Sequence, residues 1–402
     1  MVVALVIAPG CARKKPAPEP LAAPLDYAHE LPPGTVALRK ISPGEYPDFS
    51  AAVTAPNLDA VVGAIGNSLA YLSRPSSRNA YPYLDVTHDR AVASLVALRE
   101  LLNDPAVRAN PNLLNQRILE RFDVYTSVGA PRANGPGYTG KVLFTGYFTP
   151  TYEASLTRTG PFQWPLYRRP ADLVSDAGGE TLGRRTPDGQ VVPYYSRAEI
   201  EGGGKLAGIE VVWLKDRWEA YVVTGQGSAR LRLRDGRILE LGYAGHNGHQ
   251  YESPAMKMVA DGVLRKEEIS AAALRDHFAK HPGAMDKYLW HNPRTVFFAD
   301  RPGGPFGSLN VPVTPMATIA TDKKVYPPAM PAFIDTQRAP AGKAAWKQFM
   351  LDQDTGGAIR AAGRGDIYMG VGDEAEQRAG EQLSEGRLYY LALKPELVVR
   401  DQ

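Results

Sequence analysis

The chain has 402 residues, 44% of them hydrophobic, which is enough to build the cores of two domains of ordinary size. Its 46 basic and 43 acidic residues leave a formal net charge of +3, and no basic cluster is interleaved with aromatic residues, so nucleic acid is not an expected partner. A single cysteine and seven scattered histidines exclude a cysteine-rich zinc site.

The first eleven residues have the order of a bacterial lipoprotein signal. Residues 2–8 are apolar, Pro9 and Gly10 follow, and Cys11 then opens a charged stretch. The apolar run is at the short end of the usual range of about seven to fifteen residues and no basic residue precedes it, so the signal reads as truncated. We expect lipid attachment at Cys11. The alternative is a free thiol, which its charged neighbours would leave poorly buried.

Residues 12–34 predict an extended tether. Proline recurs at positions 16, 18, 20, 24, 32 and 33, which stiffens the backbone and denies it a packed core. No later run approaches about twenty apolar residues, so a lipid anchor is the only membrane contact that we expect.

Three amphipathic helices are predicted after the tether. Apolar residues recur at steps of three and four in residues 58–72, 92–102 and 113–122. Asp104 and Pro105 end the second stretch, and Pro111 and Asn112 open the third.

From Lys141 onward the pattern changes to that of strands. Val142 and Phe144 alternate with smaller or polar neighbours, and glycines and prolines then separate short apolar runs. The strands that we expect lie at 211–214, 221–223, 231–233, 296–298 and 388–391, with others around Ile319, Phe333 and Met350. Helices are predicted at 269–278, with Ser270 as N-cap, and at 374–383, with Asp373 as N-cap.

Two aspartates in the segment 353–372, QDTGGAIRAAGRGDIYMGVG, are the first candidates for chemistry. Asp354 precedes a turn with two glycines, where the backbone can approach a ligand, and Asp366 stands at a short strand. The alternative is that both are turn residues that cap their own backbone amides.

This segment resembles the C-terminal signature of the membrane-bound lytic murein transglycosylase A family. Four further blocks agree with the family in their order: TGYFTPTYEAS at 145–155, PLYRRP at 165–170, GKLAGIEVVWLKD with TGQGSARLRL between 204 and 233, and GYAGHNGHQY at 242–251. The resemblance spans roughly residues 138–394.

The resemblance implies a mainly β fold with flanking helices. In the family, a double-psi β-barrel with a three-aspartate domain is interrupted by a second β domain, and the substrate groove lies between them. Block by block, the barrel domain with its N-terminal helices would take residues 35–149 and 304–402, and the inserted substrate-binding domain residues 150–303. Periodicity alone indicates only a mainly β chain with helices at one end.

The activity implied is cleavage of the β-1,4 bond between N-acetylmuramic acid (MurNAc) and N-acetylglucosamine (GlcNAc) in peptidoglycan. A lytic transglycosylase is a carbon–oxygen lyase, because the C6 hydroxyl of MurNAc attacks its own ring and forms a 1,6-anhydro product without water. One carboxyl group can serve as acid and then as base. By resemblance this group is Asp366, followed by Ile367 and Tyr368, while Asp354 and Asp322 complete the family's three aspartates and set its pKa.

Several residues are candidates for holding sugar. Tyr147 could stack on a pyranose face, Thr149 could hydrogen-bond to hydroxyl groups, and Gly146 lets the backbone come close. The alternative for Tyr147 is core packing. Weaker candidates on the same grounds are Gln226, Ser228, Tyr243 and Asn247; Ala229 replaces a glycine that is common in the family.

His246 and His249, three residues apart, could share a metal, but the flanking Gly245 and Gly248 favour a loop, and no further ligand pattern is present. We therefore expect no metal and no organic cofactor.

The expected partner is the peptidoglycan glycan strand, and the expected location is the periplasmic face of the bacterial outer membrane. Two alternatives remain open at this point: a non-catalytic peptidoglycan-binding lipoprotein, and a hydrolase with two catalytic carboxylates. The sequence leaves open whether cleavage starts at chain ends or inside strands, and it indicates no protein partner or oligomeric state.

Overall fold

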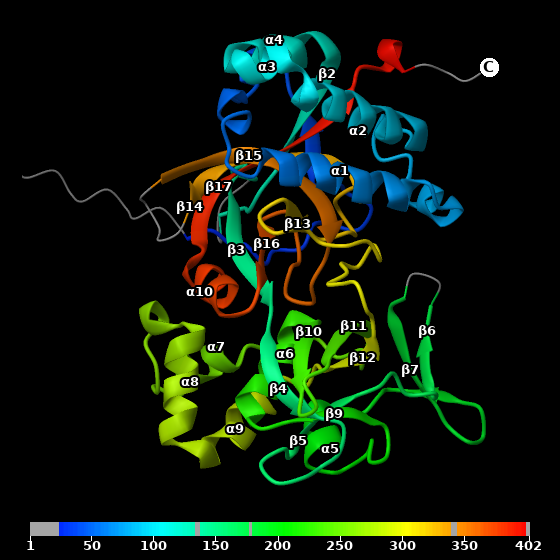
Figure 1. Ribbon diagram of the computed structural model, residues 1–402, viewed down its shortest axis with the longest axis vertical. Coiled ribbons are helices and arrows are strands. Elements are labelled where there is room, and N and C mark those ends of the chain that lie inside the picture. Colours follow the sequence, from blue (N-terminus) through cyan, green and yellow to red (C-terminus); the bar gives the residue numbers. More distant parts are fainter. Residues whose placement is uncertain (1–23, 133–136, 177–178, 339–343, 399–402) are drawn as a thin grey trace, which may run out of the picture.

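The computed structural model describes residues 24–132, 137–176, 179–338 and 344–398 (Figure 1). The lipid-attachment prediction at Cys11 and most of the predicted tether lie outside these residues. Within them, no helix is long and apolar enough to cross a membrane.

The first sheet has eight strands that come from both ends of the sequence. Their order is β1 (Leu38–Lys40), β2 (Phe122–Ser127), β17 (Leu383–Leu393), β14 (Pro331–Arg338), β15 (Ala344–Asp354), β13 (Thr318–Ala320), β16 (Arg364–Val371) and β3 (Val142–Thr149). An additional pairing between β17 and β3 closes six of these strands into a ring. The predicted barrel is confirmed at this level, and the double-psi detail is consistent with it.

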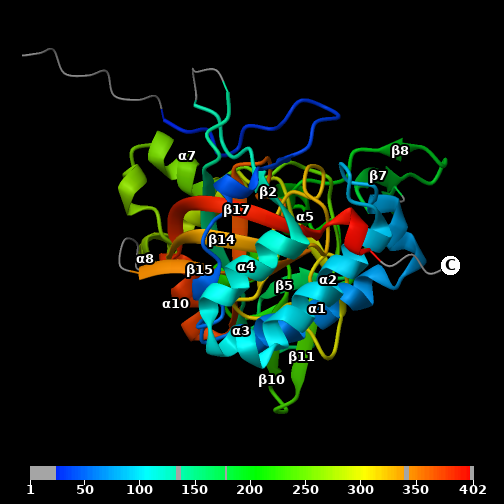
Figure 2. The same cartoon turned by 90° about the horizontal axis from the view of Figure 1, so that it is seen from above.

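The N-terminal helices cover one end of this sheet (Figures 1 and 2). They are α1 (Leu58–Leu72), α2 (His88–Asn103), α3 (Pro105–Ala109) and α4 (Pro111–Arg121), so the three predicted helices are confirmed. Local chemistry sets their starts: the Thr87 hydroxyl accepts the Arg90 N–H at α2, and Pro105 and Pro111 occupy first turns, where no N–H is needed. Their apolar faces join the strands in one hydrophobic core.

The second sheet lies on the other side of the barrel from these helices (Figure 1). Its order is β12 (Val296–Asp300), β11 (Ile238–His246), β10 (Ala229–Leu233), β4 (Thr151–Ser155), β9 (Glu210–Leu214) and β5 (Trp164–Tyr167). A separate three-stranded sheet is formed by β6 (Leu173–Ser175), β7 (Thr181–Arg185) and β8 (Val191–Val192). Only Pro150 separates β3 of the barrel from β4 of the second sheet.

Helices of this second part are α5 (Arg197–Glu201), α6 (Arg217–Gln226), α7 (Pro254–Ala260), α8 (Ala271–Lys280) and α9 (Met285–Leu289). Short 3-10 helices occur at Pro43–Glu45, Ser50–Ala52, Pro75–Ala80, Lys266–Glu268, Pro282–Ala284 and Pro395–Leu397. The Ser270 cap of α8 is confirmed, because its hydroxyl accepts the Ala273 N–H.

One predicted element and one predicted helix cap are wrong. Residues 221–223, predicted as a strand, lie inside α6, because the Asp216 side chain caps the start of the helix and Gly227, with φ of +77°, ends it. A run of three apolar residues does not distinguish strand from helix. The last helix, α10 (Asp373–Glu381), has Gly372 as its N-cap, and Asp373 is instead its first residue.

Candidate active site

The register of three barrel strands brings two of the predicted aspartates together. Ala320 on β13 pairs with Asp354 on β15 and, on its other side, with Asp366 on β16. Adjacent strands lie about 4.8 Å apart, so the Cα atoms of the two aspartates are about 10 Å apart. Asp366 in turn pairs with Thr145 on β3. The two acids therefore flank one short strand.

Asp366 is half-buried, with one hydrogen-bond donor. The Thr145 hydroxyl donates to its Oδ1 at 2.8 Å. Burial raises the pKa of Asp366 to about 6, and Asp354 adds to the rise, while Thr145 and the guanidinium of Arg364 oppose it. Because Oδ2 has no protein donor among the described residues, it can carry a proton toward a ligand.

Asp354 accepts more hydrogen bonds from the protein than Asp366 does. Tyr147 donates its hydroxyl to Oδ2 at 2.7 Å, and the backbone N–H groups of Ser308 and Thr355 donate to Oδ1 at 2.7 and 2.8 Å. Burial raises the pKa of Asp354, and these three donors oppose the rise by stabilising the charged form. Both of its oxygens are thus occupied by the protein.

Asp322 is buried and supports the loop between the other two acids. Its side chain accepts the Lys324 N–H at 3.0 Å and the Ala361 N–H at 2.9 Å. Ala361 has a φ of +70°, a conformation that costs energy for a residue with a Cβ. Asp322 therefore fixes the β15–β16 loop at its strained position.

Sequence reasoning missed a fourth acid, Asp352, which is fully buried in β15. It forms an ion pair with Lys323 and accepts hydrogen bonds of 2.8 Å from the hydroxyls of Thr321 and Tyr390. A register shift in the β13–β15 pairing lies between Asp352 and Asp354, so the two acids have different partners although they are only two residues apart in β15.

A chain of hydroxyl groups links the two sheets beside this site. The Tyr147 and Tyr368 rings lie 5.1 Å apart, and the Tyr368 hydroxyl is 2.9 Å from the hydroxyl of Thr149, which lies 3.2 Å from that of Ser228. Thr149 is only 2% exposed. The structure thus places these two predicted sugar contacts in a buried contact between β3 and the segment after α6.

Gly146 and Gln226 also make contacts within the protein. A Cβ on Gly146 would lie 2.8 Å from Cα of Ala379, so the close approach that this glycine permits is to α10. The Gln226 side-chain carbonyl accepts the Phe148 N–H at 3.0 Å and so ties α6 to β3.

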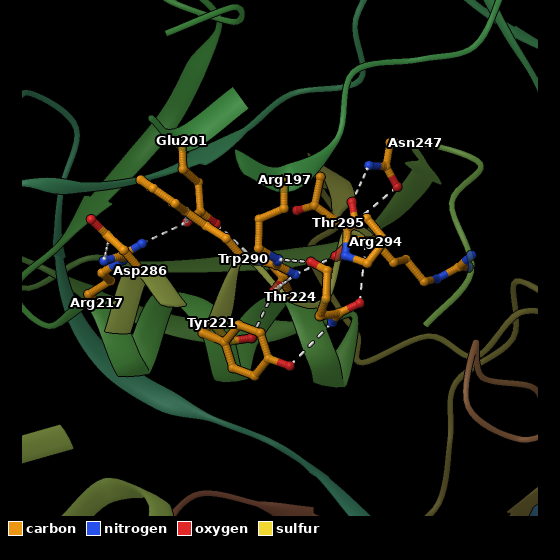
Figure 3. A network of polar contacts seen from close by, with 12 residues as sticks. Arg197, Glu201, Arg217, Tyr221, Thr224, Asn247, Asp286, Trp290, Arg294 and Thr295 are labelled. Carbon is orange, nitrogen blue, oxygen red and sulfur yellow. Dashed lines mark hydrogen bonds and ion pairs between the residues drawn. The ribbon is translucent and has the colours of Figure 1, made fainter. Parts of the chain in front are cut away.

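Tyr243 and Asn247 differ in exposure. Tyr243 is 43% exposed, as a ligand-stacking ring requires, whereas Asn247 is 1% exposed. The Asn247 amide donates to the carbonyls of Tyr195 and Pro293. Its oxygen accepts the Thr295 N–H (Figure 3). Its hydrogen bonds hold the loop that follows β11.

The same close-up shows Arg197, a buried side chain that organises the second part of the molecule (Figure 3). Its guanidinium pairs with Glu201, donates to the Thr224 hydroxyl at 3.1 Å and to the Arg294 carbonyl at 2.6 Å, and lies 4.8 Å from the ring of Tyr221. It thereby fixes α6 and the backbone from which the Arg294 side chain projects.

The two histidines weighed for metal binding both make local contacts. His246 Nδ1 accepts the Gly248 N–H at 2.9 Å, and His249 Nε2 lies 2.9 Å from the carbonyl of Tyr194. In the parts of the chain that the structure describes, no three histidine, cysteine or acidic residues are grouped to hold a metal ion.

A pocket of about 450 Å³ opens where β4 meets the start of α10. Its lining is Thr151, Tyr152, Glu153, Arg232, Val371, Gly372, Asp373, Glu374 and Arg378. None of the site residues proposed from the sequence lies in this lining.

Two family models match the chain, on the two parts that the sheets distinguish. The model described as the MltA specific insert domain matches residues 143–299, and the 3D domain model matches residues 317–392. These matches define the chain as a protein with a 3D domain and an MltA-type insert.

Curated relatives narrow the assignment. The chain is 32% identical over 276 residues to the membrane-bound lytic murein transglycosylase A of Escherichia coli K12, covering 67% of this chain and 70% of the relative. It is 28% identical to the protein of the same name from Vibrio cholerae, covering 70% of this chain and 74% of that relative. The chain belongs to the membrane-bound lytic murein transglycosylase A family.

Solved structures agree with this fold. The membrane-bound lytic murein transglycosylase from Agrobacterium tumefaciens superposes with a TM-score of 0.72 at 24% identity, covering 89% of this chain and 98% of that one. E. coli MltA with bound chitohexaose superposes with a TM-score of 0.67 at 26% identity, covering 94% and 100%.

Proposed function

We propose that this chain cleaves the β-1,4 bond between MurNAc and GlcNAc of peptidoglycan, with Asp366 as the single acid and base. Family membership gives the class, a lytic transglycosylase. The observation that carries the residue assignment is the half-buried carboxyl of Asp366, with a pKa of about 6 and one free oxygen. Such a group is both protonated and ionised in useful amounts near neutral pH.

The reaction then proceeds in two proton transfers. Protonated Asp366 gives its proton to the glycosidic oxygen, the bond from that oxygen to C1 of MurNAc breaks, and positive charge develops on the sugar ring. The Asp366 carboxylate next takes the proton of the C6 hydroxyl, whose oxygen bonds to C1 and closes the 1,6-anhydro ring. The carboxyl group is restored, and no water is consumed.

In this proposal Asp354 acts by position and charge. Its carboxylate contributes to the raised pKa of Asp366 and is fixed by Tyr147 and two backbone amides. Because both of its oxygens accept protein hydrogen bonds, it is a poor nucleophile or base for water. This occupancy disfavours the two-carboxylate hydrolase. A pure binding protein, the other alternative, has no need of a carboxyl group with a raised pKa.

Glycan is the proposed ligand, and the chitohexaose bound to E. coli MltA supports this choice. We further propose that residues 35–149 with 304–402 form the catalytic domain, that residues 150–303 form the substrate-binding domain, and that the strand lies between them. The separate sheets on either side of Pro150 support this division. We also propose that Cys11 anchors the protein at the periplasmic face of the outer membrane.

Mass spectrometry of a peptidoglycan digest tests the reaction. Purified protein should release muropeptides that end in 1,6-anhydro-MurNAc. Products that carry one added water at that end would show that the protein is a hydrolase instead. If no product is released, the protein only binds peptidoglycan.

A further inference from the structure

Two arginines from distant parts of the chain meet at the glycine turn that follows Asp354. A Cβ on Gly357 would lie 2.6 Å from Nε of Arg294, so that guanidinium rests directly on the turn. From the same loop, Arg360 donates its Nε–H to the Gly357 carbonyl at 3.3 Å. Both side chains are half-buried. Arg294 precedes β12 in the second sheet, whereas Arg360 lies in the loop between Asp354 and Asp366.

A third arginine lies beside the end of β11. Arg169 donates to the Ala244 carbonyl and to the Ser175 hydroxyl, both at 3.0 Å. All three arginines act electrostatically on the side chains of Tyr243 and His246. Burial, followed by these three positive charges, lowers the pKa of His246 to about 4. A Cβ on Gly245 would lie 2.5 Å from Nη1 of Arg169, and Arg294 donates to the His249 carbonyl at 3.0 Å, so both guanidinium groups lie at the end of β11. With Arg360, which meets Arg294 at Gly357, we call them the arginine cluster: Arg169, Arg294 and Arg360.

The positive charge of the arginine cluster is not balanced by an ion pair. Among the residues that the structure describes, none of the three guanidinium groups pairs with a carboxylate, and their hydrogen-bond acceptors are neutral oxygens such as the His249 carbonyl. The nearby acid is Glu180, which lies 3.7 Å from His246 and is exposed. Burial lowers the pKa of Arg294, and the charge of Arg360 adds to this, while Tyr243 and Glu180 oppose it without restoring the usual value. Half-buried cations that repel one another favour an incoming anion.

The arginine cluster borders the loop that joins Asp354 to Asp366, with Arg294 and Arg360 both at Gly357. Arg360 is six residues from each of Asp354 and Asp366 in the loop that joins their strands. Tyr243, which the cluster surrounds, is exposed and offers a ring face for a sugar. A neutral sugar could stack on the Tyr243 ring, but it carries no charge that would pair with the three guanidinium groups.

We propose that the arginine cluster binds a carboxylate carried by the glycan strand, next to the cleaved bond. This inference rests on the proposed function and deepens it. Two sources supply the same chemistry: the free carboxylate of the MurNAc lactyl group in strands without peptides, and the carboxylates of the peptide stem where the lactyl group is amidated. Planar guanidinium groups bind carboxylates through paired hydrogen bonds, which explains arginine at these positions.

The test compares three ligands in a background that carries Asp366→Asn, so that strands are not cut during binding. Chitohexaose has no carboxylate, peptide-free strands carry lactyl carboxylates, and intact strands carry stem carboxylates. We expect Arg360→Gln to weaken binding of a carboxylate-bearing ligand about tenfold, as for a lost charged hydrogen bond. Binding of chitohexaose should stay unchanged, and Arg360→Lys should recover part of the loss.

Arg234→Gln is the matched control, because Arg234 is an exposed arginine in the turn between β10 and β11, which projects from the body of the molecule (Figure 2). If Arg360→Gln weakens binding of peptide-free strands, the arginine cluster binds the lactyl carboxylate. If it weakens binding of intact strands alone, the cluster binds a carboxylate of the peptide stem. An equal effect of Arg360→Gln on all three ligands, or no effect on any, overturns the inference. Anhydro product from the unaltered enzyme is measured separately, so that failure of the proposed function is distinguished from failure of the arginine cluster.

Discussion

The Tyr147 hydroxyl donates a hydrogen bond of 2.7 Å to Asp354 across 207 residues of sequence. This bond joins β3, the last strand before the second sheet, to β15, the strand that ends at the glycine turn. Burial and the neighbouring Asp354 charge raise the pKa of Tyr147 well above its usual value, so its hydroxyl remains a donor at neutral pH. The tyrosine first considered for sugar stacking is thus engaged with an acid of the site.

Tyr147→Phe tests this relationship. Removing the donor leaves one oxygen of Asp354 unsatisfied, and we expect product release to fall about tenfold, which corresponds to about 1.4 kcal/mol of a charged hydrogen bond. Glycan affinity should change little, because the ring is retained. Kinetics on isolated strands separate the two effects. A loss confined to affinity would return Tyr147 to a sugar-binding role.

Asp366→Asn should reduce the release of anhydromuropeptides at least about a hundredfold, the low end for losing a general acid. The amide keeps the size of the side chain and can still accept the Thr145 hydrogen bond. Asp354→Asn should be milder, since that residue acts on its neighbour. Activity that survives in the Asp366 variant would contradict the single-acid mechanism.

The pKa of Asp366 predicts the pH dependence of activity. The acid step needs the proton, and because the pKa is about 6, the rate of the first step should fall about tenfold per pH unit well above that value. The rate should rise as pH falls toward 6 and then level off, because the carboxylate that acts as base is formed by the first proton transfer itself. A profile of kcat/KM between pH 5 and 9 checks this; a flat profile through pH 8 is incompatible with it.

The same raised pKa predicts a change in stability. A carboxyl group whose pKa is higher in the folded state stabilises the fold below its unfolded pKa, and this contribution is lost as pH rises through about 6. Asp366→Asn should therefore raise Tm relative to the unaltered protein at pH 8, and by less at pH 4. Calorimetry at the two pH values measures the difference. A larger rise in Tm at pH 4 than at pH 8 would contradict a raised pKa of Asp366 in the folded protein.

Asp352→Asn should destabilise the barrel. The change removes the charge that pairs with the half-buried Lys323, and leaving that ammonium group without its partner costs about 2 kcal/mol. Urea unfolding measures the loss, and Asp335→Asn is the control, since its ion pair with Lys347 is partly exposed. Equal stabilities of the two variants would contradict the assignment of a structural role to Asp352.

Much of the local structure could be predicted from the sequence. Helix α1 follows from the apolar spacing of residues 58–72, and the cap of α8 from Ser270, because period and capping are encoded within a few residues. The aspartates at 354 and 366 stood out as candidates, but Asp beside Gly is also common in turns, so their assignment to the site came from the family resemblance. The family resemblance then supplied the barrel and the activity, both of which local patterns leave undetermined.

Tertiary structure decided which partner each of these residues has. Thr145 meets Asp366 across 221 residues, and Gly146 accommodates α10, although nothing near either in sequence indicates the contact. The burial of Thr149 and the meeting of Arg294 with Arg360 are likewise decided by the tertiary structure. Strand register and barrel closure are properties of the whole chain, since each is fixed by packing summed over many distant residues. The sequence determined which side chains could do chemistry, and the closed sheet decided which of them stand together.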